Sequence, residues 1–207
     1  MKNQAVLEAA CQQIEREARA VAGVAQLLNN SFIEVADLCL RMTGKVIVTG
    51  AGTSGHAGRR MAHLLSVSGT PAVFLHPMDC LHGTMGAITK DDVVFAISKG
   101  GGSDELNQLC SILREKGTKI VALTENESSE LAGLADVTVL LHTPDQADPG
   151  NVIAMGSTLV SGVWGDALAY VLMRLRKRSW KETLEIHPAG AVGKMQTAPE
   201  ELNRLDR

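Results

Sequence analysis

The chain has 207 residues, of which 45% are hydrophobic, 21% charged and 3% aromatic, and its formal net charge is −3. This length and composition are typical of one globular domain with a full hydrophobic core, and they exclude a disordered chain. The negative charge, the lack of a basic stripe and the scarcity of aromatic side chains argue against nucleic acid as a partner.

The cysteines and the apolar segments indicate the compartment. Four cysteines show neither CxxC spacing nor a disulfide framework, which predicts free thiols in a reducing environment. Charges interrupt residues 1–20, so these residues lack the apolar centre of a signal peptide. The longest apolar stretch, 152–172, contains Asp166 and several glycines and serines, which favours a buried or interface helix over a membrane span. We therefore expect a cytoplasmic protein without membrane contact.

Apolar periodicity predicts the order of elements. Helical spacing covers residues 4–42, with a break and cap at Asn29-Asn30-Ser31. Strands and helices then alternate: strands are predicted at 45–49, 72–75, 93–97, 119–123 and 137–141, and helices at 55–68, 103–116, 128–134, 152–178 and just before 187. A loop with a short helix is predicted at 76–87. The strands are nearly continuous apolar runs, as expected when helices cover both faces of a parallel sheet.

These elements predict a doubly wound α/β fold: a five-stranded parallel sheet between helical layers, in a flavodoxin-like three-layer sandwich. The predicted domain covers residues 1–207. It is divided into N-terminal helices at 1–44, an α/β core at 45–178, and a C-terminal helix and histidine-containing loop at 179–207.

Two loops rich in glycine and serine follow predicted strands. The first reads Gly-Ala-Gly-Thr-Ser-Gly-His at 50–56, and the second reads Ser-Lys-Gly-Gly-Gly-Ser-Asp-Glu at 98–105. Because the strands are parallel, both loops begin at the same edge of the sheet, which is the edge where ligands bind. Helix N-termini there present free N–H groups to an anion. Ser98 and Ser103 add hydroxyl donors, and Lys99 adds a charge. Together the loops predict a small ligand with a phosphate and a second polar part.

Two other interpretations of the loops stay open. Gly50-x-Gly52-x-x-Gly55 matches the dinucleotide fingerprint, which would indicate a nicotinamide enzyme. That fingerprint also needs an acidic residue at the end of the second strand, where this chain has Leu75-His76-Pro77 and reaches Asp79 only later. Alternatively, the loops are only tight strand-to-helix turns with N-caps.

Motifs along the chain resemble the sugar isomerase (SIS) domain, and within that family the D-arabinose 5-phosphate isomerases. The resemblance covers about residues 46–195 and rests on Gly50-x-Gly52-x-Ser54-Gly55-His56, His76-Pro77 with His82-Gly83, Ala96-Ile97-Ser98 with Gly101 and Glu105, Gly165-Asp166-Ala167-Leu168-Ala169, and His187-Pro188-x-Gly190-Ala191-x-Gly193. It implies interconversion of an aldose phosphate and a ketose phosphate through an enediol, without a redox cofactor. It also implies a homotetramer with sites at subunit interfaces.

The chain departs from the pattern of those isomerases at three places. It has Thr53 where they usually have lysine, Gln146 at about the place of a glutamate, and Gly100 where their second loop has serine. Lys99 would replace the missing lysine charge from another direction. These departures favour keeping a second hypothesis, a phosphosugar-binding SIS module without catalysis.

The resemblance also implies roles for single residues. Glu105 is the candidate base, because it begins the helix after the second loop; a glutamate favoured by the helix dipole is the alternative. His187 would open the sugar ring or transfer protons across a subunit boundary, and His82 would orient or protonate the carbonyl end, unless it is a core histidine. The predicted substrate and phosphate ligands are Gly52, Thr53, Ser54, Ser98, Lys99, Gly101, Ser103 and Gln146. No metal site is predicted, and Asp166 is expected to make a structural hydrogen bond.

Overall fold

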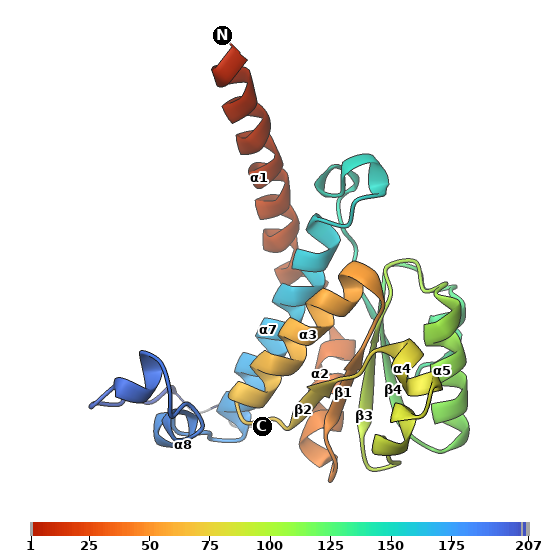
Figure 1. Ribbon diagram of the computed structural model, residues 1–207, viewed down its shortest axis with the longest axis vertical. Coiled ribbons are helices and arrows are strands. Elements are labelled where there is room, and N and C mark those ends of the chain that lie inside the picture. Colours follow the sequence, from red (N-terminus) through yellow and green to blue (C-terminus); the bar gives the residue numbers. More distant parts are fainter. Residues whose placement is uncertain (1, 204, 206–207) are drawn as a thin grey trace.

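The computed structural model describes residues 2–203 and 205, apart from the side chains of Lys2 and Asp145. Met1, Arg204, Asp206 and Arg207, which the predicted domain includes, lie outside the described residues. Within the described residues, one parallel sheet has the strand order β2-β1-β3-β4-β5. Its strands are β1 (Val46–Thr49), β2 (Ala72–Phe74), β3 (Val93–Ile97), β4 (Lys119–Thr124) and β5 (Val137–Leu140). The doubly wound α/β prediction is confirmed (Figure 1).

The strand order reverses between β1 and β3, because the chain moves from β1 outward to β2 and then returns to the other side of β1. The register aligns Val48 of β1 with Phe95 of β3, and Phe95 with Val121 of β4. In sheets of this kind the crevice at the reversal point is where ligands bind. The reversal therefore brings the loops after β1 and β3 side by side.

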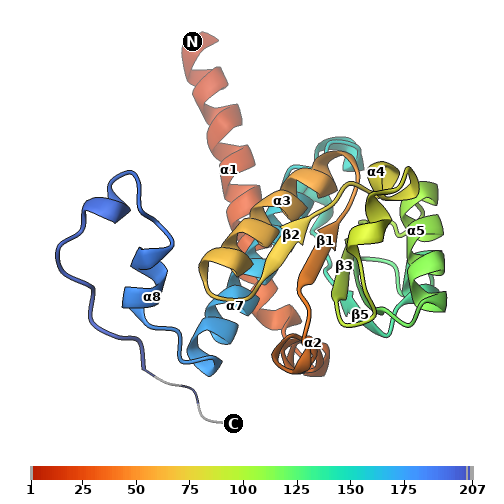
Figure 2. The ribbon, with the colours of Figure 1, turned by 60° about the horizontal axis from the view of Figure 1, so that its bottom comes forward.

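Helices cover both faces of the sheet (Figure 2). Their bounds are α1 (Lys2–Leu27), α2 (Asn30–Arg41), α3 (Gly52–Val67), α4 (Pro77–Leu81), α5 (Asp104–Glu115), α6 (Glu130–Leu134), α7 (Gly156–Leu175) and α8 (Trp180–Glu185). Val48 and Phe95 belong to the hydrophobic cluster beneath α2, α3 and α7, and Ile47 and Val94 to the cluster beneath α5. This alternation follows from the period of two in a strand that is buried on both faces. Trp164 of α7 packs edge-on against Phe95, with ring centroids 6.3 Å apart.

The starts of α3 and α7 differ from the predicted ones. The helix after the first loop begins at Gly52 rather than 55, because the Gly55 N–H already donates to the Ala51 carbonyl at 3.1 Å and closes the first turn. The loop with a short helix predicted at 76–87 is confirmed: it contains α4 and a 3₁₀ turn at 84–87, separated by Gly83 at φ +117°. The predicted helix from 152 begins only at 156, and a 3₁₀ turn at Pro149–Asn151 lies before it.

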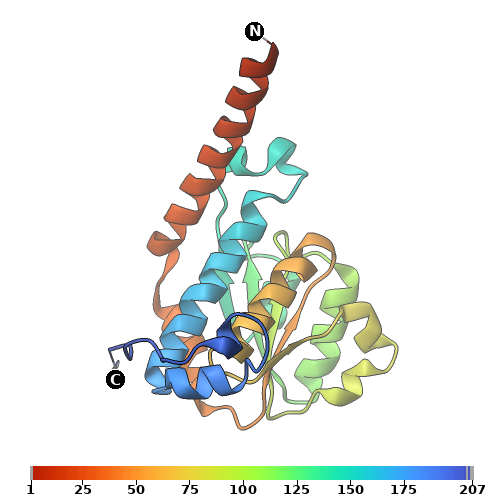
Figure 3. The same cartoon turned by 60° about the vertical axis from the view of Figure 1, so that its left-hand side comes forward.

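The two ends of the chain extend from the core. The N-terminal half of α1 projects beyond the sheet and exposes Val6, Leu7 and Ile14 (Figures 1 and 3). At the other side, α8 and the segment after it follow the far end of α7 (Figure 2). Among the described helices, none is long and apolar enough to cross a membrane.

The cysteines are free thiols throughout the described chain, as predicted. Cys39, Cys80 and Cys110 are buried and Cys11 is exposed. Burial raises the pKa of the Cys39 and Cys110 thiols to about 12, so these two side chains act as small core residues rather than nucleophiles.

Candidate functional site

The two predicted loops meet at the carboxyl edge of the sheet. A Cβ atom at Gly50, directly after β1, would lie 3.0 Å from the Ile97 carbonyl oxygen at the end of β3, so glycine lets the two loops approach each other. In the second loop, Gly101 adopts φ +67°, and a Cβ atom there would collide with the Ser129 side chain. Glycine at these two positions is therefore required by close packing and by backbone conformation.

The second loop is held in shape by its own hydrogen bonds. The Gly101 N–H donates to the Ser98 hydroxyl and to the Ser98 carbonyl, each at 3.2 Å. The Ser98 and Ser103 hydroxyls share a hydrogen bond of 3.3 Å, and the Asn107 side chain donates to the Gly101 carbonyl at 3.2 Å. Helix α5 begins directly after Ser103, so this preformed loop presents hydroxyl groups beside a helix N-terminus.

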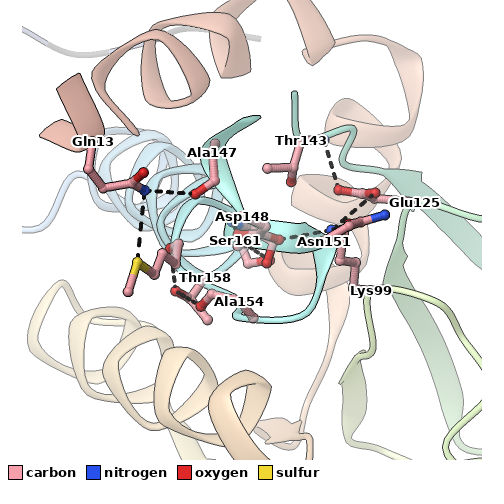
Figure 4. A network of polar contacts seen from close by, with 12 residues as sticks. Gln13, Lys99, Glu125, Thr143, Ala147, Asp148, Asn151, Ala154, Thr158 and Ser161 are labelled. Carbon is pink, nitrogen blue, oxygen red and sulfur yellow. Dashed lines mark hydrogen bonds and ion pairs between the residues drawn. The ribbon is translucent and has the colours of Figure 1, made fainter. Parts of the chain in front are cut away.

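The Lys99 side chain leaves this loop and ends among carboxylate and amide oxygens (Figure 4). Its Nζ donates to Asp148 Oδ2 at 2.8 Å and to Asn151 Oδ1 at 2.7 Å, and lies 4.0 Å from Glu125 Oε2. Glu125 is itself fixed, because its Oε1 accepts the Thr143 N–H at 2.8 Å. The cluster of Lys99, Glu125, Asp148 and Asn151, called the Lys99 cluster below, joins the second loop to β4 and to the segment before α7.

Asp148 is the buried centre of the Lys99 cluster, with 1% of its surface exposed. Its second oxygen accepts the N–H of Ser157, in the first turn of α7, at 3.0 Å. Burial alone would raise the pKa of this carboxyl group, but the hydrogen bonds from Lys99 and Ser157 outweigh it and hold the pKa below its ordinary value. Asp148 is therefore a charged acid that connects the second loop to the N-terminus of α7.

A small cavity of about 30 Å³ lies beside the Lys99 cluster. Ser54 from α3, Lys99, and Ser157, Thr158 and Ser161 from α7 supply its polar lining. This volume is enough for one water molecule or one hydroxyl group. The cavity is thus a pocket of hydroxyl groups with a single ammonium group among its lining side chains.

A wider groove of about 390 Å³ adjoins this cavity, since Ala57 and Thr158 line both. It runs between α3 and α7, and Thr53, His56 and Arg60 face it from α3. Arg60 makes two hydrogen bonds to Asp166 of α7, at 2.5 and 2.8 Å, which confirms the structural hydrogen bond predicted for Asp166. The same hydrogen bonds raise the pKa of Arg60.

The structure brings most of the predicted ligand residues to this one edge. Ser54 and Lys99 share the small cavity, and Thr53 lines the adjoining groove. Gly52 begins α3 at φ +53°, while Ser98, Gly101 and Ser103 form the preformed second loop. Glu105 is half-buried in the first turn of α5, directly after that loop. Gln146 is exposed in a 3₁₀ turn (Asp145–Ala147), two residues before Asp148.

The two candidate histidines are placed differently. His82 is exposed at the end of α4, the helix that follows the carboxyl end of β2. His187 follows α8, beyond the far end of α7, and its Nδ1 shares a hydrogen bond of 2.7 Å with the Thr183 carbonyl. The 20 residues of α7 span about 30 Å, and the helix begins beside the Lys99 cluster. One copy of the chain therefore does not bring His187 to the two loops.

Sequence reasoning missed the partners of Lys99. Glu125 directly follows the last residue of β4, and a polar residue at the carboxyl end of a parallel strand is a signal that would have identified it. Asp148 and Asn151 lie in the segment between β5 and α7, where apolar periodicity gives no information. Among the described residues, no group of three histidine, cysteine or acidic side chains is arranged to hold a metal ion.

The strand order and the loops at the reversal point define a doubly wound α/β domain with a candidate ligand site at the carboxyl edge of its sheet. Comparison with known families then identifies the domain. Residues 39–170 match the SIS domain profile, and the chain belongs to the SIS domain family.

Solved structures agree with this assignment. A proposed sugar-phosphate isomerase from Listeria monocytogenes is 33% identical, with a TM-score of 0.88, and the match covers 91% of this chain and 100% of that one. A protein from Escherichia coli CFT073, solved in complex with A5P, is 29% identical with a TM-score of 0.87 and the same coverage.

Among curated sequences, an arabinose 5-phosphate isomerase from Pseudomonas aeruginosa is 36% identical over 188 residues, which are 91% of this chain and 58% of the relative. One from Francisella tularensis is 39% identical over 170 residues, which are 81% of this chain and 52% of the relative. The chain thus spans a little more than half the length of these curated relatives.

Proposed function

We propose that this chain is a sugar-phosphate isomerase that interconverts an aldose phosphate and a ketose phosphate, with arabinose 5-phosphate as the first substrate to test. The observation that carries the proposal is the convergence of Ser54, Lys99 and the preformed loop 98–103 at the reversal point of the sheet. Curated arabinose 5-phosphate isomerases at 36–39% identity support it, as does a similar structure in complex with A5P.

The reaction needs a base, a proton donor and a fixed phosphate. In the proposed mechanism, the phosphate binds the Ser98 and Ser103 hydroxyls at the N-terminus of α5, where the helix dipole favours an anion. Glu105, in the first turn of the same helix, removes the proton from the carbon next to the carbonyl. The electrons of that C–H bond form the C=C bond of the enediol, and the carbonyl oxygen takes a proton, which His82 supplies.

Return of a proton to the neighbouring carbon completes the isomerisation. Glu105 delivers it, the hydroxyl on the carbon that was first deprotonated returns its proton to His82, and that C–O bond becomes the new carbonyl. Protons and electrons are only redistributed within the sugar, so the overall reaction consumes no redox equivalent. General acid–base transfer of this kind supplies roughly 10²–10⁴-fold of the rate, and the rest comes from orientation and charge stabilisation.

We further propose that the site is completed in a cytoplasmic homotetramer. His187 lies beyond the far end of α7 in its own chain, so a second copy has to supply it to the loops. Exposed apolar side chains on the projecting helix α1, at Val6, Leu7 and Ile14, support such an assembly. Sedimentation velocity at micromolar concentration should give a tetramer, and a monomeric protein with full activity would contradict this part of the proposal.

Incubation with pentose, hexose and heptose phosphates in deuterium oxide tests the activity. Mass spectrometry should detect conversion of at least one aldose phosphate to its ketose phosphate, with deuterium gained at carbon. Glu105→Gln should reduce turnover by roughly 10³-fold or more and leave binding intact. Glu130→Gln, which changes a first-turn glutamate of α6, is the matched control and should leave turnover unchanged. Equal turnover in Glu105→Gln and wild type would remove Glu105 as the base.

A phosphosugar-binding module without catalysis is the second candidate. The exposed amide side chain of Gln146, and an ammonium group at Lys99 that is already held by carboxylates, favour it. Thermal stabilisation by a sugar phosphate, together with no deuterium uptake from solvent, would establish this candidate. Thermal stabilisation by NAD instead would support the interpretation of the first loop as a nicotinamide-cofactor site.

A further inference from the structure

The ammonium group of Lys99 has one donor to spare. An ammonium group carries three N–H donors. Among the described residues, Asp148 and Asn151 accept two of them at 2.8 and 2.7 Å. Glu125 Oε2 lies 4.0 Å from the same nitrogen, which is an ion-pair distance but too long for a hydrogen bond. Lys99 also lines the small cavity, so a ligand oxygen there can accept the third donor.

The charge around Lys99 indicates which kind of ligand oxygen accepts this third hydrogen bond. One ammonium group stands beside two carboxylates, Glu125 and Asp148, so the Lys99 cluster carries a net charge of −1 at neutral pH. A phosphate dianion would be repelled by those carboxylates. A neutral hydroxyl or carbonyl oxygen accepts the hydrogen bond without that repulsion, and the other polar groups lining the cavity are hydroxyls. The cavity volume of about 30 Å³ also suits one hydroxyl group.

We infer that Lys99 binds the uncharged, carbonyl end of the sugar rather than its phosphate, and that Asp148 is the positioning residue that aims the ammonium group. This inference rests on the proposed function and makes it more specific. It places the phosphate on the backbone and hydroxyls of loop 98–103, and the carbonyl end toward Ser54, Ser157 and Ser161. When the C–H bond next to the carbonyl breaks, negative charge develops on the carbonyl oxygen, and the third N–H donor stabilises it.

Asp148 is suited to a positioning role because it is fixed from both sides. One carboxylate oxygen holds Lys99, and the other accepts the Ser157 N–H at the start of α7. Because Asp148 is buried, water does not compete for these two hydrogen bonds. Asp148 lines neither the small cavity nor the adjoining groove, so it acts on a ligand through Lys99.

Lysine NMR tests the contact independently of turnover. In protein with labelled lysine ammonium or ε-methylene groups, Lys99→Arg assigns the Lys99 signal. Saturating arabinose 5-phosphate should shift that signal, whereas inorganic phosphate at the same occupancy of the site should leave it in place. An unmoved Lys99 signal with bound arabinose 5-phosphate would overturn the inference, and so would an equal shift with inorganic phosphate. The proposed function fails separately, if wild-type protein takes up no solvent deuterium into any sugar phosphate.

Kinetics test the roles of the two residues. Lys99→Met should lower kcat by roughly 10²–10³-fold with a KM change of less than about threefold, because the lost donor acts on developing charge. Lys99→Arg should recover part of this loss. Asp148→Asn should lower kcat by about tenfold and should have little further effect in a Lys99→Met background, because it acts through Lys99. Wild-type kcat in folded Lys99→Met, or full additivity of the two substitutions, would overturn the inference.

Discussion

Two buried aspartate–lysine pairs occupy opposite edges of the sheet, and they are built differently. At the amino edge, Asp92 accepts the Lys45 backbone N–H at 2.8 Å and its ammonium group at 3.2 Å, and the Thr89 N–H at 2.7 Å. The Lys45 ammonium also donates to the Ala87 carbonyl at 3.1 Å. This pair sets one carboxylate against one ammonium group and fixes the start of β1 to the turn before β3.

At the carboxyl edge, the Lys99 cluster sets two carboxylates and an amide around one ammonium group, beside a cavity lined by hydroxyls. The aspartates are equally buried, at 1% exposure each, and hydrogen bonds to the charged form hold both pKa values low against the effect of burial. The difference lies in charge balance and in the spare donor. This difference matches the proposed roles, in which the Lys45 pair serves stability and the Lys99 cluster contacts the ligand.

Exchanging each lysine for methionine gives the largest contrast. Lys99→Met should reduce kcat by roughly 10²–10³-fold, whereas Lys45→Met should lower thermal stability and leave kcat within about twofold. Both variants are checked by steady-state kinetics and by thermal unfolding of the same preparations. A decrease in kcat of similar size in Lys45→Met would show that the two lysines do not differ in their effect on catalysis.

Two glycines with left-handed backbone allow the same comparison for the loops. Gly101, at the carboxyl edge, has φ +67° and faces Ser129, while Gly117, at the amino edge, has φ +82° and open space around it. Gly117→Ala should cost about 1–2 kcal/mol of unfolding free energy from backbone strain alone. Gly101→Ala adds a steric conflict and should cost about 2–4 kcal/mol in urea unfolding. Equal costs would show that the contact with Ser129 is not a constraint.

The pH dependence of stability should be shared by both edges. Asp92 and Asp148 have folded-state pKa values below the ordinary 3.8, so their ionised forms stabilise the fold at neutral pH. That contribution is lost as the pH falls through 3.8 toward the folded-state values. Asp92→Asn and Asp148→Asn should each cost about 1–3 kcal/mol at pH 7 and flatten the loss of stability between pH 5 and pH 3. A variant as acid-sensitive as wild type would contradict the depressed pKa.

The smallest effect is expected at an ion pair that belongs to neither edge. Arg60 and Asp166 bridge α3 and α7, with 53% and 34% of their side chains exposed. Solvent screens such a pair, so Asp166→Asn should change the unfolding free energy by less than about 1 kcal/mol. Chemical denaturation checks this prediction. A loss of unfolding free energy as large as that of Asp148→Asn would show that the difference in exposure does not determine how much each aspartate stabilises the fold.

The apolar runs of the sequence predicted the strands to within one residue at every end, because strands buried on both faces leave little choice of sequence. Helix starts were less predictable: the hydrogen bond from the Gly55 N–H to the Ala51 carbonyl starts α3 at Gly52 despite its positive φ, and the segment before α7 forms 3₁₀ turns. Such boundaries depend on single backbone angles that apolar periodicity does not report.

The candidate site was predictable to the extent that it follows from strand order. Ser54 lies in the first turn of the helix that follows β1, and Lys99 lies in the loop that follows the neighbouring strand β3, so their meeting at one cavity follows from topology. The partners of Lys99 were not predictable, because Asp148 is 49 residues away in an irregular segment. His187 was predicted from its motif, but its separation from the loops depends on the length of α7 and on where that helix ends.

A crystal structure with arabinitol 5-phosphate, a substrate-like compound without a carbonyl group to react, tests the central claim most directly. The phosphate should lie against residues 98–103, with the opposite end of the sugar chain within hydrogen-bond distance of the Lys99 ammonium group and near Glu105. A compound bound with its phosphate on Lys99, or bound away from the carboxyl edge of the sheet, would contradict the account.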